Sequence, residues 1–246
     1  MPFTAFISDL HLSAERPAAT EAFFDFLRDV APGADALYIL GDLFEYWAGD
    51  DDLSDPFNAR VAAAIAAAAA RVPVYLIHGN RDFLLQDGFA RAAGVDFLPE
   101  RHVTDLYGER TLLMHGDLLC TDDRRYQAFR RVVRNRLVQR IGLLLPLARR
   151  KAIFGSARRM SAREIQTKPM SIMDVNQAAV MQALRDSGCA RLIHGHTHRT
   201  ARHEHVVDDR RCQRWVLSDW YTRGQYLRVA PGSWESIELP FPQASP

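Results

Sequence analysis

Five short apolar runs in this sequence end in polar side chains that could hold metal ions. These side chains are Asp9, His11, Asp42, Asn80, His115, His196 and His198. Oxygen and imidazole ligands without thiolate suit Mn²⁺, Fe²⁺ or Zn²⁺. Seven ligands exceed the needs of one ion, so the set predicts two ions about 4 Å apart, which could activate a water and hold the oxygens of a transferring phosphoryl group.

Asp42 is the residue that we expect between the two ions. It and Asp9 are the two acids of the set, and a shared carboxylate can hold two cations close together. Asp9 and His11 are two residues apart, as are His196 and His198. In an extended chain such residues face the same side, so each pair could reach one ion. A turn after the strand could instead send the two histidines of the second pair to different ions.

The elements that must position these ligands are the apolar runs themselves, which indicate buried strands. They cover residues 3–7, 36–40, 72–77, 111–114 and 190–193. In open α/β sheets the ligand crevice lies beyond the carboxyl ends of the strands, so five polar clusters should converge there. One histidine after a strand is more often structural, but five clusters together favour a site.

Helices are expected between the strands, and further strands near the C-terminus. The predicted helices run from Pro17 to Gly33, from Pro56 through the alanine run, from about 84 to 93, and from 174 to 187. Alternation of strand and helix indicates parallel neighbours. Four later runs, near 201–207, 212–218, 225–230 and 233–239, could form a second sheet or extend the first.

The length of 246 residues fits one large α/β domain. We expect a single domain over residues 1–246, with a helical insertion at about 121–170. No apolar run is long enough to cross a bilayer and no secretory signal is apparent, so we expect the protein in the cytoplasm. The three cysteines form no CxxC pair, which argues against a zinc-thiolate site.

The insertion is strongly basic, with fourteen Lys or Arg against three acids between Asp122 and Lys168. Such a run is either a solvated helix surface or a contact for an anionic partner. An apolar stripe at helical spacing predicts a helix packed on the core for part of its length: Tyr126, Phe129, Val133, Leu137, Ile141 and Leu144. The apolar run 141–147 is typical of a segment in a membrane interface or over greasy ligand chains.

Five short motifs resemble those of the calcineurin-like metallophosphoesterases. They are DLH at 9–11, GDLF at 41–44, GNRD at 79–82, HGD at 115–117 and GHTH at 195–198. The resemblance implies two mixed β-sheets flanked by helices, an α/β/β/α sandwich with a helical lid insertion. It also implies that one metal is held by Asp9, His11, Asp42 and His198, and the other by Asp42, Asn80, His115 and His196.

Arg81 departs from a common pattern of that family, in which histidine stands between the Asn and the Asp. Arginine cannot give up its proton near neutral pH, so an alkoxide leaving group would lack its acid. A phosphate leaving group departs as a stable anion and needs only a cation beside it. Arg81 therefore points to cleavage of a pyrophosphate link. The simpler alternative is that Arg81 only binds a substrate phosphate.

Further segments resemble one subfamily, the UDP-2,3-diacylglucosamine hydrolases of lipid A biosynthesis. They are Arg81, the acidic run 41–51, the basic insertion, SIMDVN at 171–176 and VLSDWYTRGQYL at 216–227. The resemblance implies a diphosphatase with two Mn²⁺ ions per chain, in which water attacks the α-phosphate to give UMP and 2,3-diacylglucosamine 1-phosphate. It implies that the catalytic residues are Asp42, Asn80, Arg81 and His115.

The same resemblance implies contacts to the substrate from the insertion. Sugar and phosphate would be bound by Asn80, Arg81, Asp123, Ser161, Lys168 and His196. The subfamily often has an Asn near position 165, where this chain has Ile165, so one polar contact to the sugar is not carried over. We expect a monomer on the cytoplasmic face of the inner membrane, where the basic and apolar lid meets an anionic membrane surface.

Two other functions remain open on the sequence alone. A soluble phosphodiesterase or nuclease could hold nucleic acid with the insertion, where aromatic and basic residues are interleaved at 126–134. The apolar tip at 141–147 argues against this, and we expect no nucleic acid. A scaffold that only binds proteins would be expected to have lost ligands, and none of the seven is missing.

Overall fold

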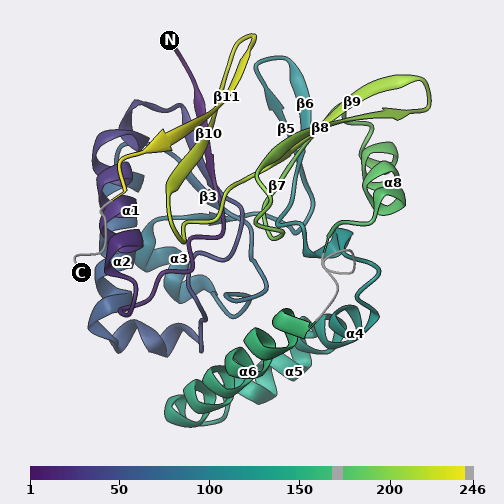
Figure 1. The fold of residues 1–246 in the computed structure, drawn as a ribbon. Coiled ribbons are helices and arrows are strands. Elements are labelled where there is room, and N and C mark those ends of the chain that lie inside the picture. The colour runs from purple at the N-terminus through teal and green to yellow at the C-terminus, as the bar shows by residue number, and fades with distance from the viewer. Residues whose placement is uncertain (168–173, 242–246) are drawn as a thin grey trace.

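The computed structural model describes residues 1–167 and 174–241, with side chains described outside 158–167. Two β-sheets lie face to face, and helices cover the outer face of each (Figure 1). Apolar residues of both sheets meet in the middle, among them Phe6 and Ile77 of the first sheet and Ile193 of the second. The predicted sandwich of two mixed sheets between helices is confirmed.

The first sheet has six strands in the order β11-β10-β1-β2-β3-β4. Their bounds are β1 Thr4–Ile7, β2 Ala36–Ile39, β3 Val74–Leu76, β4 Asp96–Phe97, β10 Gly224–Ala230 and β11 Ser233–Leu239. β1 to β4 pair in parallel, as the alternation of strand and helix predicts, whereas β10 and β11 add antiparallel strands at one edge.

The second sheet has five strands in the order β5-β6-β7-β9-β8. Their bounds are β5 His102–Leu106, β6 Glu109–Leu113, β7 Arg191–His194, β8 Ala201–Val207 and β9 Arg210–Val216. β6 and β7 are parallel, with Leu113 opposite Ile193, so both end at the same edge. The four C-terminal runs therefore divide, two joining each sheet, which the sequence left open.

The helices over the first sheet are α1 Pro17–Asp29, α2 Pro56–Ala69 and α3 Asp87–Ala93, and α8 Gln177–Ser187 covers the second. Asp55 caps α2 by accepting a hydrogen bond from the Phe57 amide, and Pro56 occupies the first turn. α3 ends at Gly94 in the left-handed conformation. Short 3-10 helices cover Ala31–Gly33, Asp50–Ser54 and Asp117–Leu119.

The described part of the insertion forms three helices that extend from one end of the sandwich (Figure 1): α4 Arg124–Val133, α5 Arg136–Leu143 and α6 Leu147–Thr167. The predicted stripe is divided, because the Asn135 side chain accepts hydrogen bonds from two amides and starts a new helix. The stripe was expected to pack on the core for part of its length, and burial is confined to two of its six residues. Only Tyr126 and Val133 are partly buried, whereas Phe129, Leu137, Ile141 and Leu144 are exposed.

Arginines, rather than the apolar stripe, hold the insertion to the body. Arg130 and Arg150 are buried. Arg130 pairs with Asp117, and Arg150 pairs with Asp51 and donates to the Ala48 carbonyl. Burial of charged groups is favourable only when they are paired, and both guanidinium groups are. Across the described helices, none is long and apolar enough for a bilayer span.

Candidate metal centre

The predicted ligands follow five strands drawn from both sheets. Asp9, Asp42 and Asn80 come after β1, β2 and β3, while His115 and His196 come after β6 and β7. Because these strands all end at one edge of the sandwich, their polar ends meet there. The structure brings the seven side chains that the sequence singles out into two adjoining groups.

The first group consists of Asp9, His11 and His198. The Nε2 atoms of the two histidines are 3.2 Å apart, and Nε2 of His198 lies 3.5 Å from Oδ1 of Asp9. One ligand atom from each residue lies within 4.8 Å of the others. This spacing fits a single cation between them.

The second group consists of Asp42, His115 and His196, with Asn80 between the two rings. Oδ1 of Asn80 is 3.0 Å from Nε2 of His115 and 2.9 Å from Nδ1 of His196. Two imidazoles, an amide oxygen and a carboxylate therefore face one point.

Asp42 lies between the groups. Its Oδ2 is 3.8 Å from Nε2 of His11 and its Oδ1 is 3.7 Å from Nε2 of His115. One oxygen thus faces each group, which is the arrangement expected of a bridging carboxylate. Oδ1 of Asp9 is buried and has no hydrogen-bond donor among the described residues, so a cation would satisfy it. The residues present therefore fit a pair of divalent ions.

The backbone at these ligands is strained. Five of them have left-handed φ angles: Asp9 56°, His11 50°, Asp42 53°, His196 69° and His198 54°. Residues other than glycine rarely adopt this region, and such outliers concentrate at functional sites. Gly79 and Gly195 pack directly against the carboxylates: a Cβ at Gly79 would lie 2.1 Å from Oδ1 of Asp42, and one at Gly195 2.1 Å from Oδ2 of Asp9.

Burial sets the direction of the pKa shift at Asp42, His11 and His196. At His115 and His198 neighbouring carboxylates outweigh burial and raise the pKa. Burial raises the pKa of Asp42 to about 7, helped by the carboxylates of Asp82 and Asp9 and opposed by His115. Burial also lowers the pKa of His11 well below its ordinary value and that of His196 to about 4. Neutral imidazoles are the form that binds metal, and a cation would favour the ionised form of Asp42.

Two buried acids support the ligands, and the sequence reasoning assigned them no role. Asp82 accepts hydrogen bonds from the amides of Leu43 and Gly79, at 2.7 and 2.8 Å. Asp117 accepts from Nε of Arg130 and the hydroxyl of Tyr126, at 2.7 and 2.8 Å. Asp82 belongs to the GNRD motif and Asp117 to the HGD motif. Their membership of these motifs is the sequence feature that could have indicated a role at the site.

The expected substrate contacts are only partly described. The Arg81 amide donates to Oδ1 of Asp42 at 2.9 Å, and its Nε is buried without a hydrogen-bond acceptor in the described part of the chain. Asp123 caps α4, its Oδ1 accepting from the Tyr126 amide at 3.0 Å. Ser161 belongs to α6, but its side chain, like that of Ile165, is among those not described, and Lys168 lies outside the described residues.

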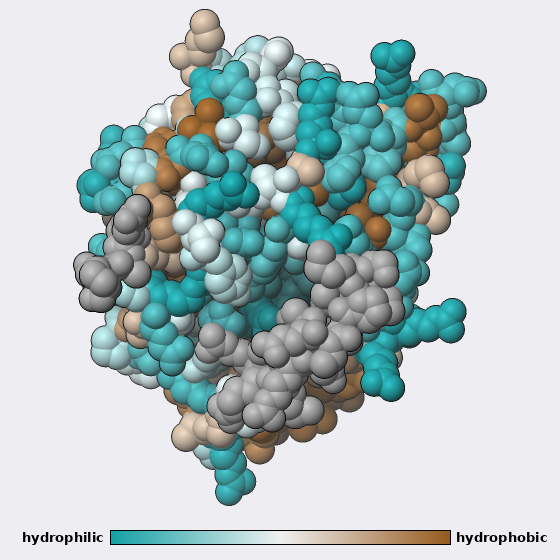
Figure 2. All heavy atoms as spheres, in the orientation of Figure 1, coloured by the Kyte–Doolittle hydropathy of each residue, from teal (hydrophilic) through white to brown (hydrophobic). Residues whose placement is uncertain are grey.

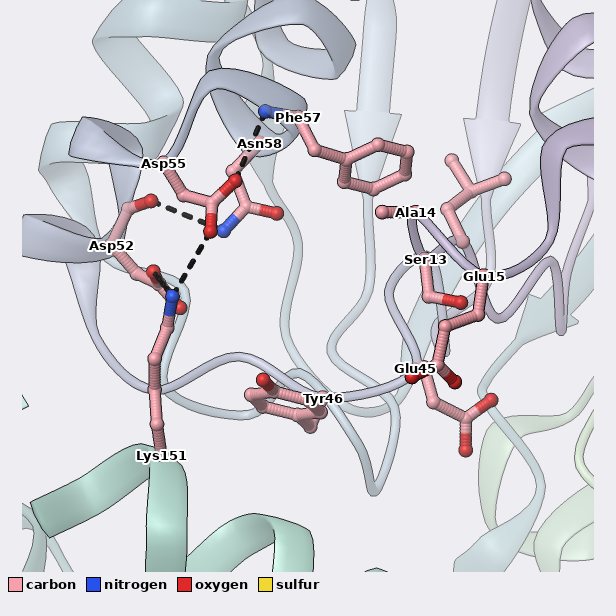
Figure 3. A pocket seen from close by; sticks show the side chains of 11 residues that line it. Ser13, Ala14, Glu15, Glu45, Tyr46, Asp52, Asp55, Phe57, Asn58 and Lys151 are labelled. Atoms are coloured by element: carbon pink, nitrogen blue, oxygen red, sulfur yellow. Dashed lines mark hydrogen bonds and ion pairs between the residues drawn. The ribbon is translucent and has the colours of Figure 1, made fainter. Parts of the chain in front are cut away.

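A cavity of about 160 Å³ adjoins the first ligand group (Figure 3). Glu45 connects the two, because it lines the cavity while its Oε2 lies 3.7 Å from Nδ1 of His11. On the opposite side Lys151 reaches from α6 to Asp52 and Asp55, at 2.7 and 3.1 Å. The insertion and the body therefore both form walls of this cavity.

Comparison with known proteins places these residues in a family. The sequence profile described as calcineurin-like phosphoesterase matches residues 4–200, a range that includes every ligand of the centre. The chain belongs to the calcineurin-like phosphoesterase family. A dinuclear metal centre is characteristic of this family, in agreement with the two ligand groups.

The relatives within the calcineurin-like phosphoesterases include proteins named UDP-2,3-diacylglucosamine hydrolase. The one from Serratia proteamaculans is 50% identical over 239 residues, covering 97% of this chain and 99% of the relative. The one from Aeromonas hydrophila is 52% identical over 230 residues, covering 93% and 95%. Such identity over nearly the whole of both chains makes this chain a member of the same hydrolase family.

Among solved structures, a hypothetical protein from Pyrococcus horikoshii OT3 has a similar fold. It is 12% identical in sequence with a TM-score of 0.51, over 99% of this chain and 90% of the other. At that identity the similarity concerns the fold alone.

Proposed function

We propose that this protein hydrolyses the pyrophosphate bond of UDP-2,3-diacylglucosamine. Water attacks the α-phosphate, and the products are UMP and 2,3-diacylglucosamine 1-phosphate, an intermediate of lipid A biosynthesis. The proposal is supported by relatives of that name at about 50% identity over nearly the whole chain. It is also supported by the complete ligand set of the centre.

The single observation that carries the chemistry is the position of Asp42 between two ligand groups. When bound, two Mn²⁺ ions would supply a nucleophilic water and would stabilise charge on the phosphoryl oxygens. Asp9, His11, Asp42 and His198 would hold one ion, and Asp42, Asn80, His115 and His196 the other. The mixed oxygen and nitrogen donors suit manganese.

Arg81 is the residue that we assign to the leaving group. Its backbone amide is hydrogen-bonded to Asp42, so the residue stands at the edge of the centre. A guanidinium there can stabilise a departing phosphate, although it cannot protonate an alkoxide. The leaving group here is the 1-phosphate of the diacylglucosamine, which departs as an anion and needs only the positive charge of Arg81 to stabilise it. We place Asp123, Ser161 and Lys168 of the insertion, with Asn80 and His196, around the glucosamine and its phosphate.

We assign the exposed apolar face of the insertion to the acyl chains and the membrane. Phe129, Ile141 and Leu144 are 55, 58 and 84% exposed. Figure 2 shows apolar surface along the lower edge of the molecule, where Figure 1 places the insertion. A contiguous apolar face beside basic residues favours the interface of an anionic membrane. The protein would act there as a peripheral monomer on the cytoplasmic face of the inner membrane.

Nucleic acid fits the insertion less well than lipid. Four of its cations already have partners within the protein: Arg130 with Asp117 and Glu100, Arg134 with Glu100, Arg150 with Asp51, and Lys151 with Asp52. Charges so engaged are not free to neutralise phosphates along a strand. Fewer cations of the insertion are therefore available to bind nucleic acid than the nuclease alternative assumes.

The test is release of UMP from UDP-2,3-diacylglucosamine with added Mn²⁺. We expect turnover by the unaltered protein and a loss of at least a hundredfold in Asp42→Asn, because the bridging carboxylate is lost. A phosphodiester and single-stranded DNA serve as competing substrates. Faster cleavage of either one would replace the lipid assignment, and equal turnover by Asp42→Asn would remove the metal mechanism.

A further inference from the structure

We propose that helix α4 of the insertion positions the ligands of one metal subsite and not of the other. The second subsite is the group Asp42, Asn80, His115 and His196, and the first is Asp9, His11 and His198, which share Asp42 with it. The inference rests on the two-metal centre of the family. It adds that the affinity of the second subsite for metal depends on the contacts that α4 and Arg134 make with the loops of that subsite.

Arg134 of the segment after α4 reaches the loop that carries Asn80. Its Nη2 donates to the carbonyl oxygens of Gly79 and His78, at 2.8 and 3.3 Å. The same loop contacts Asp42, because Gly79 is so close that a Cβ there would overlap Oδ1 of Asp42. The guanidinium therefore fixes the backbone from which one ligand projects and against which a second ligand packs.

Asp117 connects α4 to the remaining ligands of the second subsite. This buried acid lies two residues after His115 and accepts hydrogen bonds from Arg130 and from Tyr126 of α4. The ring of Tyr126 also stacks on the ring of His196, with centroids 5.9 Å apart. The loops of His115 and His196 are thus both in contact with α4.

The first subsite is supported by other elements. Asp9 accepts from the Ser8 hydroxyl at 2.6 Å and the His196 amide at 2.8 Å. Nδ1 of His198 lies 3.4 Å from Asp219, and the Tyr221 ring lies 5.3 Å from that of His11. The hydrogen bonds and ion pairs that the structure gives for these three ligands come from the sandwich and not from the insertion.

The difference between the two subsites should be measurable as a difference in metal affinity. Groups that orient metal ligands typically change metal affinity by about 10- to 100-fold when they are removed. Loss of the Arg134 hydrogen bonds should therefore weaken binding of the second ion by roughly that factor. Binding of the first ion should change much less, because Asp42 is its one ligand that packs on the Gly79 loop. Since coupling between two sites is reciprocal, binding of the second ion must also tighten the docking of α4.

The experiment is calorimetric titration of the full-length, chelator-stripped protein with Mn²⁺. Arg134→Met keeps an unbranched stem and removes the hydrogen bonds of the guanidinium and its ion pair with Glu100. Arg150→Met is the matched control, because it also removes a guanidinium paired with an acid of the body. Arg150 joins the insertion to Ala48 and Asp51, six and nine residues beyond Asp42 in the connection between β2 and α2. Its hydrogen bonds and ion pair go to none of the seven ligands. We expect two ions in the unaltered protein and in Arg150→Met, and a second ion bound 10- to 100-fold more weakly in Arg134→Met.

Binding of the first ion reports whether each variant is folded. If Arg134→Met loses the first ion as well, Arg134→Lys, which retains the charge and one donor, carries the test with an intermediate weakening of the second ion. If a folded Arg134 variant binds both ions with the affinities of the unaltered protein, the inference is overturned. A single ion in the unaltered protein would instead refute the two-metal centre, and the proposed mechanism with it.

Hydrogen exchange gives an independent readout of the reciprocal effect. Amides of α4 in the unaltered protein should exchange more slowly once the second Mn²⁺ binds, because the loops that α4 contacts become fixed. The same amides in Arg134→Met should show a smaller slowing. Slowing of equal size in both proteins would show that α4 is not coupled to the metal through Arg134.

Discussion

Helices α1 and α4 are both amphipathic, but α1 packs on the protein through its apolar face and α4 through its charged face. α1 buries Phe23, Phe26 and Leu27 against the first sheet. α4 buries Arg130 and leaves Phe129 and Val132 exposed. Helix α1 is therefore held by apolar burial, which is strong and without direction, whereas α4 is held largely by directed charge pairs and hydrogen bonds. Its apolar face is left for something other than the core.

The largest test of this contrast compares one phenylalanine from each region. Phe23→Ala should lower the free energy of unfolding by about 3–5 kcal/mol, because it opens a cavity in the core. Phe129→Ala should change it by no more than about 0.5 kcal/mol, since its side chain is exposed. Denaturant unfolding measures both. A comparable loss in the two variants would mean that the insertion is packed like the core.

The second test compares how bound Mn²⁺ stabilises the sandwich and the insertion. With free Mn²⁺ at about 100 times its dissociation constant, the unfolding free energy should rise by about 2.7 kcal/mol, because the ion binds only the folded chain. The ligands belong to loops of the sandwich, so Phe129→Ala should retain the whole gain. Thermal melts with Mn²⁺ and with a chelator measure this. No stabilisation by Mn²⁺ would exclude the preformed centre.

The exposed face of the insertion provides the third test. Replacing both Ile141 and Leu144 with serine should weaken binding to anionic vesicles roughly tenfold, because apolar area is lost from the interface. Val206→Ser is the control, since Val206 is 67% exposed on β8, outside the insertion. Vesicle sedimentation measures the difference. Equal binding by all three proteins would remove the membrane role and leave the hydrolysis intact.

The smallest expected effect concerns the ion pairs of Lys151. Lys151→Met should cost at most about 1 kcal/mol, because the ammonium is partly exposed and its pairing with Asp52 and Asp55 is screened by water. The cost should shrink further as salt is added. Denaturant unfolding at low and high ionic strength tests this. A loss above about 2 kcal/mol would show that this pair, unlike a surface pair, anchors α6.

Strand positions and ligand convergence could be predicted from the sequence because both depend on local patterns. The bounds of β8 and β11 agree with the runs found by alternation and turn residues. The convergence of Asp9, Asp42 and the histidines followed from strand ends alone, since parallel strands bring their carboxyl ends to one edge.

The orientation of the insertion could not be predicted in the same way. A helical stripe shows that one face is apolar, but it does not show whether that face meets protein, lipid or ligand. The deciding contacts, Arg130 with Asp117 and Arg150 with Asp51, join residues 13 and 99 positions apart. Asp117 and Asp82 were visible as motif letters, yet only the fold shows which amides and guanidinium groups they meet.

The left-handed backbone at five ligands implies a conflict between durability and catalysis. Each such residue other than glycine costs about 1–2 kcal/mol relative to an ordinary conformation. Glycine would relieve that cost at a partly buried position such as His198, and so would give a more stable protein that has lost a ligand. Selection for thermal stability alone would therefore favour substitutions that remove metal ligands and abolish activity. Directed evolution of a more thermostable variant should also select for enzymatic turnover.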